Sequence, residues 1–543
     1  MVSRAQAFIV VSCVLCCGYL PPPSAAASSP GPGDGDGDGD GDGFLRCLSA
    51  AMPSRLVFPR GSPSFAAALA SSIRNPKFMA PGTARPLAVA APAEASHVQA
   101  AVGCGRRHGV RLRVRSGGHD LEGLSYRSTR AEGGEAFAVV DLASLRGIRV
   151  DGQASTAWVD SGATVGELYY AVGRASGRLA FPAGLCPTIG VGGHLSGGGF
   201  GTLLRKYGVA ADHVLDAVLV DARGRLLDRD AMGSDVFWAI RGGGGASFGI
   251  VLSWQVRLVP VPPTVTAFKL PVSVGEGAVD VVTRWQTVAP ALPDDLFIRV
   301  LVQGQVAEFQ SLYLGTCGAL LPVMRRRFPE LGVNRSHCRE MTWLESVPYI
   351  YLGSGAAVED ILNRTTSLAA ASKATSDYVR EPIARAAWAE IFSSWLARPG
   401  AGLMILDPYG AAIGAAPEDA TPFPHRAGVL YNIQYMNFWA AAGGDAAAGI
   451  RWIRDLHAFM EPHVSKGPRE AYFNYRDLDL GENVVVGNVS SYEAGKVWGE
   501  KYFKGNFRRL AMAKAQIDPD DYFRNEQSIP PLIDAEQPVV INE

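Results

Sequence analysis

The sequence predicts an α+β protein whose body has two domains, and three observations support this fold class. Between residues 44 and 260, short β-branched runs such as 110–114 alternate with helical or glycine-rich pieces. A proline-rich stretch at 260–263 then marks a boundary, after which longer helical patterns begin. Between residues 429 and 439, side chains alternate with the period of a strand. We therefore expect a second α+β domain, built on an antiparallel sheet, over residues 261–467.

The N-terminal segment predicts export. Arg4 precedes an apolar stretch at 7–20, and alanines at 25–27 supply the small residues that a signal peptidase accepts. We expect residues 1–27 to be a signal peptide and residues 28–43, a Gly-Asp repeat with nothing to bury, to be a disordered leader. The predicted protein is secreted, to the extracellular space or cell wall. Three glycosylation acceptors fit this route: Asn334, Asn363 and Asn488.

The charge balance argues against nucleic-acid and acidic-lipid partners. The formal net charge is −1 at pH 7, and no long basic block interrupts the sequence. No apolar run reaches the roughly 20 residues that a membrane-spanning helix needs. We expect a monomer that acts on a small molecule, without a metal site.

The cysteine count is odd after export. Three of the eight cysteines lie in the predicted signal peptide, and five remain: Cys47, Cys104, Cys186, Cys317 and Cys338. An odd number in a secreted protein leaves one cysteine unpaired. Whether Cys317 and Cys338 pair is left open by the sequence.

Two glycine-dense stretches carry the chemistry. One is Arg-Ser-Gly-Gly-His-Asp at 115–120, and the other spans 185–201. Such loops let backbone N–H groups approach an anionic group, and each also carries a nucleophilic side chain, His119 or Cys186. A predicted helix–strand unit over 96–115 places His119 on a loop. The alternatives are a hydrogen-bonded loop histidine and a small buried or disulfide-bonded cysteine.

These two motifs resemble a known family. Arg-Ser-Gly-Gly-His-Asp, followed by Cys-Pro-Thr-Ile-Gly-Val-Gly-Gly-His at 186–194, is similar to the berberine-bridge-enzyme-like group of plant secreted FAD-linked oxidoreductases, in the vanillyl-alcohol-oxidase superfamily. The resemblance implies a PCMH-type FAD-binding domain. It further implies that FAD is bound through His119 at the 8α-methyl carbon and through Cys186 at C6, and that Cys47 and Cys104 form a disulfide.

The resemblance also assigns contacts to the cofactor. Ser116, Gly117, Gly118 and Asp120 are expected along the pyrophosphate. The remaining expected cofactor-binding residues are Arg115, Gly184, Gly190, Gly193, His194, Gly197, Gly245, Ile250, Asn474 and Asn506. For Gly245 and Ile250, which flank a turn between a helix at 235–241 and a strand at 250–258, simple packing is almost as good an interpretation.

The glycine run at 190–194 does not predict a nicotinamide enzyme. Its spacing lacks the third glycine of G-x-G-x-x-G, and no strand–turn–helix unit of the dinucleotide type surrounds it.

Two later motifs supply the predicted catalytic residues. On the strand at 429–439, Asn432, Gln434 and Met436 share one face. The resemblance puts Gln434 where the berberine-forming enzymes have a glutamate base, so the amide removes that proton acceptor. Tyr-Phe-Asn-Tyr-Arg-Asp at 472–477 resembles the family motif whose second tyrosine is assigned as base, which here is Tyr475. A phenol with its usual pKa near 10 needs electrostatic help for this role. Polar strand pairing and core packing are the respective alternatives.

The C-terminal segment is expected to return to the first domain. Four residues have helical spacing, Trp498, Tyr502, Asn506 and Leu510, and 522–530 matches the end of the family's C-terminal module. The predicted FAD domain is therefore discontinuous, comprising 44–260 and 468–543.

Three departures bear on the substrate. Leu121 and Phe200 replace tyrosines, and Asn432 replaces a lysine, of the family members that oxidise monolignols. Ile189 stands where valine accompanies oxygen use, so its extra methylene should exclude oxygen. We therefore predict a dehydrogenase that moves hydride from an alcohol or carbohydrate to flavin, with an electron acceptor that the sequence does not identify. The alternatives are a monolignol or alkaloid-type oxidase and a flavin carrier that has lost its catalytic activity.

Overall fold

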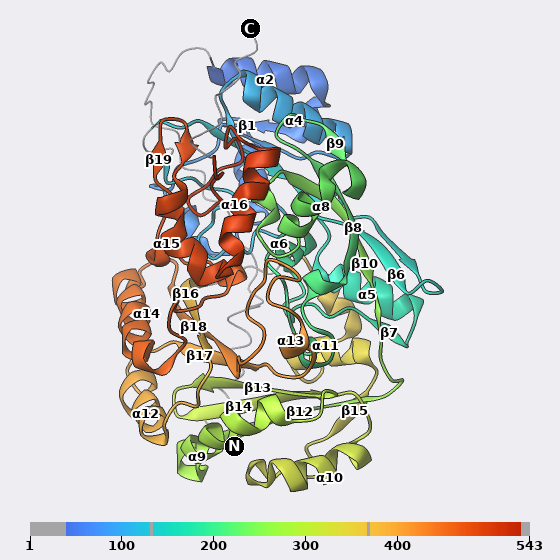
Figure 1. Cartoon of the computed structure of the whole chain (residues 1–543), viewed down its shortest axis with the longest axis vertical. Helices are drawn as coiled ribbons and strands as arrows, with labels where there is room; N and C mark the ends of the chain where they lie inside the picture. Colours follow the sequence, from blue (N-terminus) through green and yellow to red (C-terminus); the bar gives the residue numbers. More distant parts are fainter. Residues whose placement is uncertain (1–39, 131–133, 366–369, 534–543) are drawn as a thin grey trace.

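The computed structural model describes residues 40–130, 134–365 and 370–533, and its fold is α+β (Figure 1). The predicted signal peptide lies outside these residues. The first unit is a four-stranded sheet in the order β1 (Val57–Pro59), β2 (Ala88–Ala90), β4 (Phe137–Asp141), β3 (Arg111–Arg115). Helices α2 (Asp40–Ala51) and α4 (Ala95–Arg107) share an apolar core with this sheet. A shorter helix, α3 (Phe65–Ala70), contacts β1 and β2.

A second, five-stranded antiparallel sheet completes the N-terminal half. Its order is β5 (Ile148–Asp151), β6 (Thr156–Asp160), β10 (Ile250–Arg257), β8 (Val214–Val220), β9 (Leu226–Leu227). The associated helices are α5 (Val165–Ala175), α6 (Val191–Ser196), α7 (Leu204–Tyr207) and α8 (Arg229–Ile240). A small pair, β7 (Leu179–Ala180) with β11 (Val259–Pro260), lies beside them.

The second half is built on a seven-stranded antiparallel sheet. Its order is β15 (Arg339–Met341), β12 (Val265–Ser273), β14 (Val306–Tyr313), β13 (Leu296–Gln303), β17 (Leu403–Pro408), β18 (Tyr431–Ala440), β16 (Ala370–Val379). One face packs on α9 (Ala278–Val288), α10 (Cys317–Arg327), α12 (Arg385–Glu390) and α14 (Ala446–Met460). Because side chains alternate along a strand, Leu406 and Ile433 enter this core while Ile405 and Gln434 face the opposite way. Two further helices are α11 (Trp343–Tyr351) and α13 (Ala412–Ala415).

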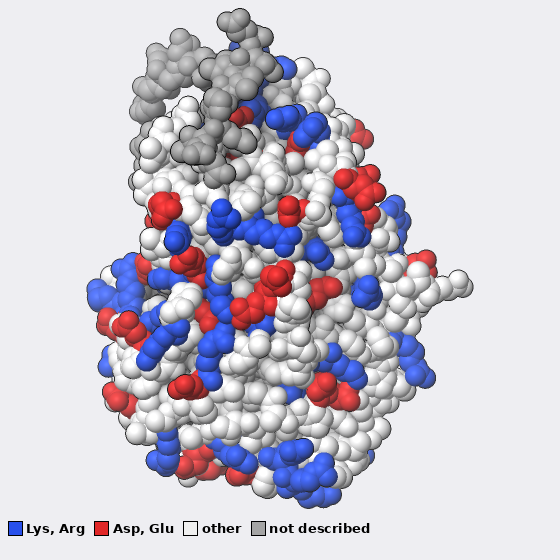
Figure 2. All heavy atoms as spheres, in the orientation of Figure 1, with Lys and Arg blue, Asp and Glu red and all other residues white. Residues whose placement is uncertain are grey.

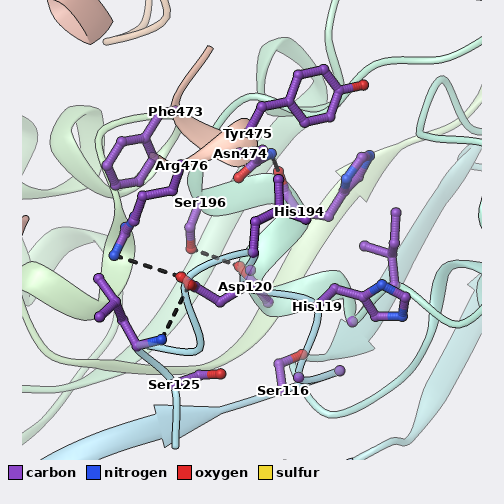
Figure 3. A pocket seen from close by; sticks show the side chains of 18 of the residues that line it. Ser116, His119, Asp120, Ser125, His194, Ser196, Phe473, Asn474, Tyr475 and Arg476 are labelled. Carbon is purple, nitrogen blue, oxygen red and sulfur yellow. Dashed lines mark hydrogen bonds and ion pairs between the residues drawn. The ribbon is translucent and has the colours of Figure 1, made fainter. Parts of the chain in front are cut away.

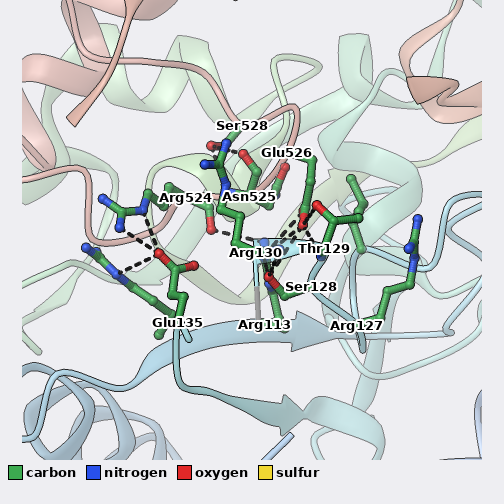
Figure 4. Close-up of polar contacts among 12 residues, drawn as sticks. Arg113, Arg127, Ser128, Thr129, Arg130, Glu135, Arg524, Asn525, Glu526 and Ser528 are labelled. Atoms are coloured by element: carbon green, nitrogen blue, oxygen red, sulfur yellow. Dashed lines mark hydrogen bonds and ion pairs between the residues drawn. The ribbon is translucent and has the colours of Figure 1, made fainter. Parts of the chain in front are cut away.

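The C-terminal segment packs against the N-terminal half. Helix α15 (Tyr492–Phe503) is followed by α16 (Asn506–Ile517), which contacts α8, and a hairpin of β19 (Val485–Val486) and β20 (Val489–Ser490) precedes them. Tyr522 and Phe523 then enter the core beneath β3. Figure 4 shows the polar side of this contact, where Arg113 of β3 forms a buried ion pair with Glu526.

Three elements differ from the sequence-based expectations. Helix α2 begins at Asp40, so the last four residues of the predicted leader, 40–43, are helical. Helix α8 is longer than predicted and is kinked at Gly233, where φ is +78°. The single helix expected over 498–510 is two helices, because the chain turns at Lys504 with φ of +50°.

Both possible disulfides form. Cys47 pairs with Cys104, as the resemblance implies, and Cys317 pairs with Cys338, which the sequence left open. Cys186 takes part in neither bond. Within the described ranges, every helix is too short or too polar to cross a bilayer. Acidic and basic side chains are interspersed over the face drawn in Figure 2, in keeping with a net charge near zero.

Candidate active site

A cavity of about 390 Å³ lies where the N-terminal half, the seven-stranded sheet and the C-terminal segment meet. Its size falls within the range of small-molecule and cofactor sites. One wall consists of the loops at 116–121 and 184–193, and another of side chains from β17 and β18. The segments 472–476 and 523–525, with residues 244–247, also line it.

The two glycine loops meet backbone to backbone, which explains their composition. A Cβ on Gly117 would lie 2.2 Å from the backbone nitrogen of Gly190. Gly118 has φ of +69°, and a Cβ there would lie 1.7 Å from the carbonyl oxygen of Ser72. Side chains at these positions would force the loops apart. His119 is therefore presented by a loop that only glycines can form.

His119 and Cys186 face the same hydroxyl group. His119 Nε2 lies 2.9 Å from Thr188 Oγ1, and Cys186 Sγ lies 3.4 Å from the same oxygen. Burial, with the positive charge of Arg74 nearby, lowers the pKa of His119 to about 3. The imidazole is therefore neutral near pH 7, the form in which a ring nitrogen can act as a nucleophile.

The lining fits a bound FAD. A Cβ on Gly193 would meet no atom within 4 Å, so the backbone at this position borders open space in which a flat group can approach closely. The cavity lining includes Leu112 and Phe523 as well as Gln434 and Tyr475. A cavity of about 390 Å³, with glycine-rich backbone, His119 and Cys186 in its lining, can accept a flavin cofactor.

The opposite wall carries polar groups that the protein leaves without hydrogen bonds. Among the described residues, no hydrogen bond reaches the Tyr475 hydroxyl or the Asp407 carboxylate. The nearest charged group to Asp407 is Arg299, whose Nη1 lies 4.0 Å from Oδ1. Burial raises the pKa of Asp407, and burial together with the charge of Asp407 raises the pKa of Tyr475 well above 10. Both groups line the cavity beside Gln434, whose side chain faces it from β18.

Aromatic packing fixes Tyr475. The Phe200 ring lies edge-on to Tyr475, with centroids 6.2 Å apart, and Tyr472 packs on both rings. Tyr472 is held in turn, because its hydroxyl accepts hydrogen bonds from the Gly199 N–H and from Asn474 Nδ2. Figure 3 shows Asn474 also bonded to the carbonyl of His194 and Arg476 reaching Asp120, on the loop that carries His119.

Most predicted site residues line this one cavity. They are Ser116, Gly117, Gly118, His119, Asp120, Gly184, Cys186, Ile189, Gly190, Gly193, His194, Gly245, Gln434, Asn474 and Tyr475. The structure thus brings together residues that are more than 300 positions apart in the chain.

Four predicted cofactor contacts do not line it. Arg115 is fully buried below the loop, where it pairs with Asp141 at 2.6 Å and donates to two backbone carbonyls. Gly197 packs against the Asn474 side chain, and Ile250 belongs to the core under β3. Asn506 donates to the carbonyls of residues 418, 421 and 422. Asn432 also lies outside the lining, with its amide bonded to the Asp377 carbonyl.

The sequence-based prediction missed Arg74, Arg299 and Asp407, all of which line the cavity. The sequence does contain a signal for two of these residues, Arg299 and Asp407. Arg299 and Asp407 are the only charged residues of β13 and β17, and a charged side chain in an otherwise apolar strand needs a polar surrounding. Arg74 precedes a short helix and carries no such signal.

Comparison with known proteins agrees with this geometry. A family model described as an FAD binding domain matches residues 86–229, and one described as berberine and berberine like matches residues 471–530. Berberine bridge enzyme-like Cyn d 4 of Cynodon dactylon is 60% identical over 98% of this chain and 99% of that protein. Berberine bridge enzyme-like 18 of Arabidopsis thaliana is 47% identical over 90% of this chain and 92% of its own length.

Two solved structures extend the comparison. The Bermuda grass isoallergen BG60 has 62% identity and a TM-score of 0.88, covering 90% of this chain and all of the other. Phl p 4, a grass pollen allergen with glucose dehydrogenase activity, has 59% identity and a TM-score of 0.89 at the same coverage.

The fold, the cavity and these comparisons define an FAD-binding oxidoreductase. The chain belongs to the berberine bridge enzyme-like family, as its two glycine motifs predicted.

Proposed function

We propose that this protein is a secreted dehydrogenase that oxidises the anomeric hydroxyl of an aldose, with glucose as the first candidate, and passes hydride to FAD. One observation carries the proposal. The Tyr475 hydroxyl and the Asp407 carboxylate, both without hydrogen bonds from the described residues, line the cavity whose other wall presents His119 and Cys186. The glucose dehydrogenase activity of Phl p 4 supports the choice of substrate.

His119 and Cys186 would hold the cofactor by two covalent bonds, one from an imidazole nitrogen and one from sulfur. When bound there, FAD supplies the two-electron acceptor for hydride. Their shared neighbour Thr188 places both side chains beside one region of the cavity. Two attachments on one wall would fix the ring relative to Tyr475 and Gln434.

Asp407 completes the proton acceptor. With a pKa well above 10, Tyr475 stays protonated near pH 7 and is a poor base alone. The other carboxylate in the lining, Asp120, accepts two backbone N–H bonds and faces Arg476. Asp407 is therefore the carboxylate suited to receive a proton, taken from the substrate hydroxyl through the Tyr475 Oη.

Ile189 would make the protein a dehydrogenase rather than an oxidase. Its side chain lines the cavity three residues after Cys186. Wild-type Phl p 4 is a glucose dehydrogenase, and its isoleucine-to-valine variant is a glucose oxidase. In the double variant of that protein, the substituted isoleucine and asparagine are five residues apart, as are Ile189 and His194 here.

Two substrate classes are disfavoured. Phe200 and Asn432 lack the phenol and the cation expected for monolignol oxidation, and Asn432 lies outside the lining. Gln434 provides an amide where an alkaloid-forming enzyme would need a carboxylate.

The proposal is tested first by the flavin absorption spectrum of acid-precipitated protein and then by reduction of the flavin with glucose. Purified protein is precipitated with acid beside His119→Ala, Cys186→Ala and the double variant. Flavin absorbance should stay with the precipitate of the wild type and each single variant, and should wash away from the double variant. Native protein is then mixed anaerobically with glucose, which should bleach the flavin band. A flavin that no aldose reduces would refute the proposed function, and a flavin that acid releases from the wild type would refute covalent attachment.

A further inference from the structure

Lys373 lies behind the cavity and contacts three carboxylates. It projects from β16 and is 6% exposed. Its Nζ lies 2.8 Å from Glu122 Oε1 and 3.3 Å from Asp479 Oδ2, and it forms a hydrogen-bonded ion pair with Asp477. It does not itself line the cavity. A buried ammonium that meets two buried carboxylates is held strongly in one place.

These carboxylates belong to the two segments that carry the proposed chemistry. Glu122 is three residues after His119, and Asp477 is two residues after Tyr475. Lys373 thus bridges the loop that attaches the cofactor and the segment that takes the proton. It does so from the sheet whose next strand, β18, carries Gln434.

A second tie joins the same two segments directly. Arg476 Nη1 lies 3.6 Å from Asp120 Oδ2. A dashed line marks this ion pair in Figure 3. Asp120 also accepts hydrogen bonds from the backbone N–H groups of Glu122 and Leu124, which stiffens the loop. The two ties use neighbouring positions, Asp120 and Glu122 on one segment and Arg476 and Asp477 on the other, so each limits the movement that the other would allow.

The surrounding charges are compatible with this role. Lys77 and Arg127 face Glu122 at 3.7 and 3.9 Å, and Arg454 faces Asp479 at 2.7 Å. Arg454 is 59% exposed and contacts neither Glu122 nor Asp477. Arg454 lies at the exposed edge of this group of charges. Its replacement removes one positive charge without breaking the contacts of Lys373 with Glu122 and Asp477, so it serves as a control.

We propose that Lys373 is a positioning residue that sets the distance between the His119 loop and the Tyr475 segment. The inference rests on the proposed function. Hydride and proton leave one carbon–oxygen unit of the substrate together, so the cofactor wall and the proton acceptor must keep a fixed separation. A displacement of about 1 Å can cost on the order of 100-fold in rate.

The experiment compares Lys373→Met with Lys373→Arg and Arg454→Met. The anaerobic rate of flavin reduction is measured over a range of glucose concentrations. The covalent flavin fraction is measured by intact mass in a Cys186→Ala background, which leaves only the His119 bond. Lys373→Met should lower the limiting reduction rate roughly 10- to 100-fold, with a smaller effect on the concentration giving half the limiting rate. It should also lower the covalent fraction. Lys373→Arg should recover most of both quantities, and Arg454→Met should match the wild type.

A control separates positioning from general destabilisation. Val302→Ala, in the core on the far face of the same sheet, should lower Tm without changing either readout. If Lys373→Met lowers Tm but keeps the wild-type reduction rate and covalent fraction, the proposal is overturned.

A second variant serves if Lys373→Met does not fold. Glu122→Gln keeps the shape of the side chain and removes one of the bridged charges, and it should lower both readouts several-fold. Unchanged values would overturn the proposal. If glucose fails to reduce even the wild type, the proposed function falls, while the covalent fraction still tests Lys373.

Discussion

Tyr475 and Asp407 are two cavity-lining groups whose buried surroundings oppose ionisation. Burial favours the neutral form of each, but the carboxyl group ionises at a far lower pH than the phenol. In the proposed mechanism Asp407 is therefore the group that accepts the proton of the substrate hydroxyl, Tyr475 relays it, and the transfer is coupled to the departure of hydride.

Removing either member of this pair should slow hydride transfer. Tyr475→Phe and Asp407→Asn should each lower the anaerobic rate of flavin reduction by about 10²- to 10⁴-fold, the usual range for a positioned acid–base group. Stopped-flow absorbance with glucose measures this rate. Met436→Leu, a substitution on the same face of β18, is the control and should change it little. A wild-type rate for Asp407→Asn would show that Tyr475 acts without the carboxylate.

The side chain at position 189 should decide the electron acceptor. Ile189→Val removes one methylene group from the cavity lining and should increase oxygen consumption with glucose, while the rate of flavin reduction stays near that of the wild type. An oxygen electrode and anaerobic stopped flow measure the two steps separately. Ile189→Leu keeps the side-chain volume and should remain a dehydrogenase. Equal oxygen consumption in all three proteins would contradict this role.

Acid should destabilise the fold through His194. Burial lowers the pKa of His194 to about 4, and its Nε2 accepts a hydrogen bond from the Gly184 N–H. In the unfolded chain the group has its usual pKa near 6.5, so below that pH the unfolded state binds the proton first and stability falls. For this one histidine, the loss at pH 5 is about 2 kcal/mol. His194→Asn should flatten the decline in unfolding free energy between pH 7 and 5. The unfolding free energy is measured by chemical denaturation at each pH. An equal decline in the wild type and in His194→Asn would contradict this role of His194.

At the scale of elements, the disulfide between Cys317 and Cys338 ties the start of α10 to the turn before β15. Closing a loop of 21 residues should contribute about 3 kcal/mol. The double variant Cys317→Ala/Cys338→Ala should unfold at correspondingly lower denaturant concentration. Because neither cysteine lines the cavity, the rate of flavin reduction should be unchanged. A large loss of that rate would show that this region supports the site.

The sequence predicted elements well where a local pattern defines them. The strand at 111–115 and the strand that becomes β10 appear as expected. The first follows a helix that ends before Gly109, and the second has alternating apolar and polar residues in its sequence. The break at Lys504 could not be predicted, because a lysine with positive φ has no signature in composition or spacing. The same holds for the kink at Gly233, since an isolated glycine within a helical pattern is usually tolerated.

The candidate site was predictable in part for a similar reason. The glycine motifs predicted the loops around His119 and Cys186, because a close approach of two backbones requires glycine. The resemblance identified Arg115 as a cofactor contact, whereas the fold uses it as a buried partner for Asp141. Asp407 reaches the cavity only through the register of β17 beside β18, where it is paired with Asn432. The register depends on how the two strands pair, so the sequence of either strand alone does not predict it.

At the scale of the whole molecule, the C-terminal segment is held by charges that the N-terminal sheet buries. Arg113 is 2% exposed and Glu526 is fully buried. Arg113→Met should lower the unfolding free energy by about 3–5 kcal/mol, because it leaves a buried carboxylate unpaired. The exposed pair of Arg106 and Asp520 is the control, and Asp520→Asn should cost less than about 1 kcal/mol. Chemical denaturation measures both, and similar losses in the two variants would contradict this distinction.

The contribution of Phe523, Arg524 and Asn525 to the cavity wall constrains the biosynthesis of the protein. These residues are synthesised about 400 positions after the loop that carries His119. A growing chain therefore cannot enclose the cofactor as soon as the glycine motifs emerge. Enclosure of the cofactor would therefore wait until translation has produced residues 523–525.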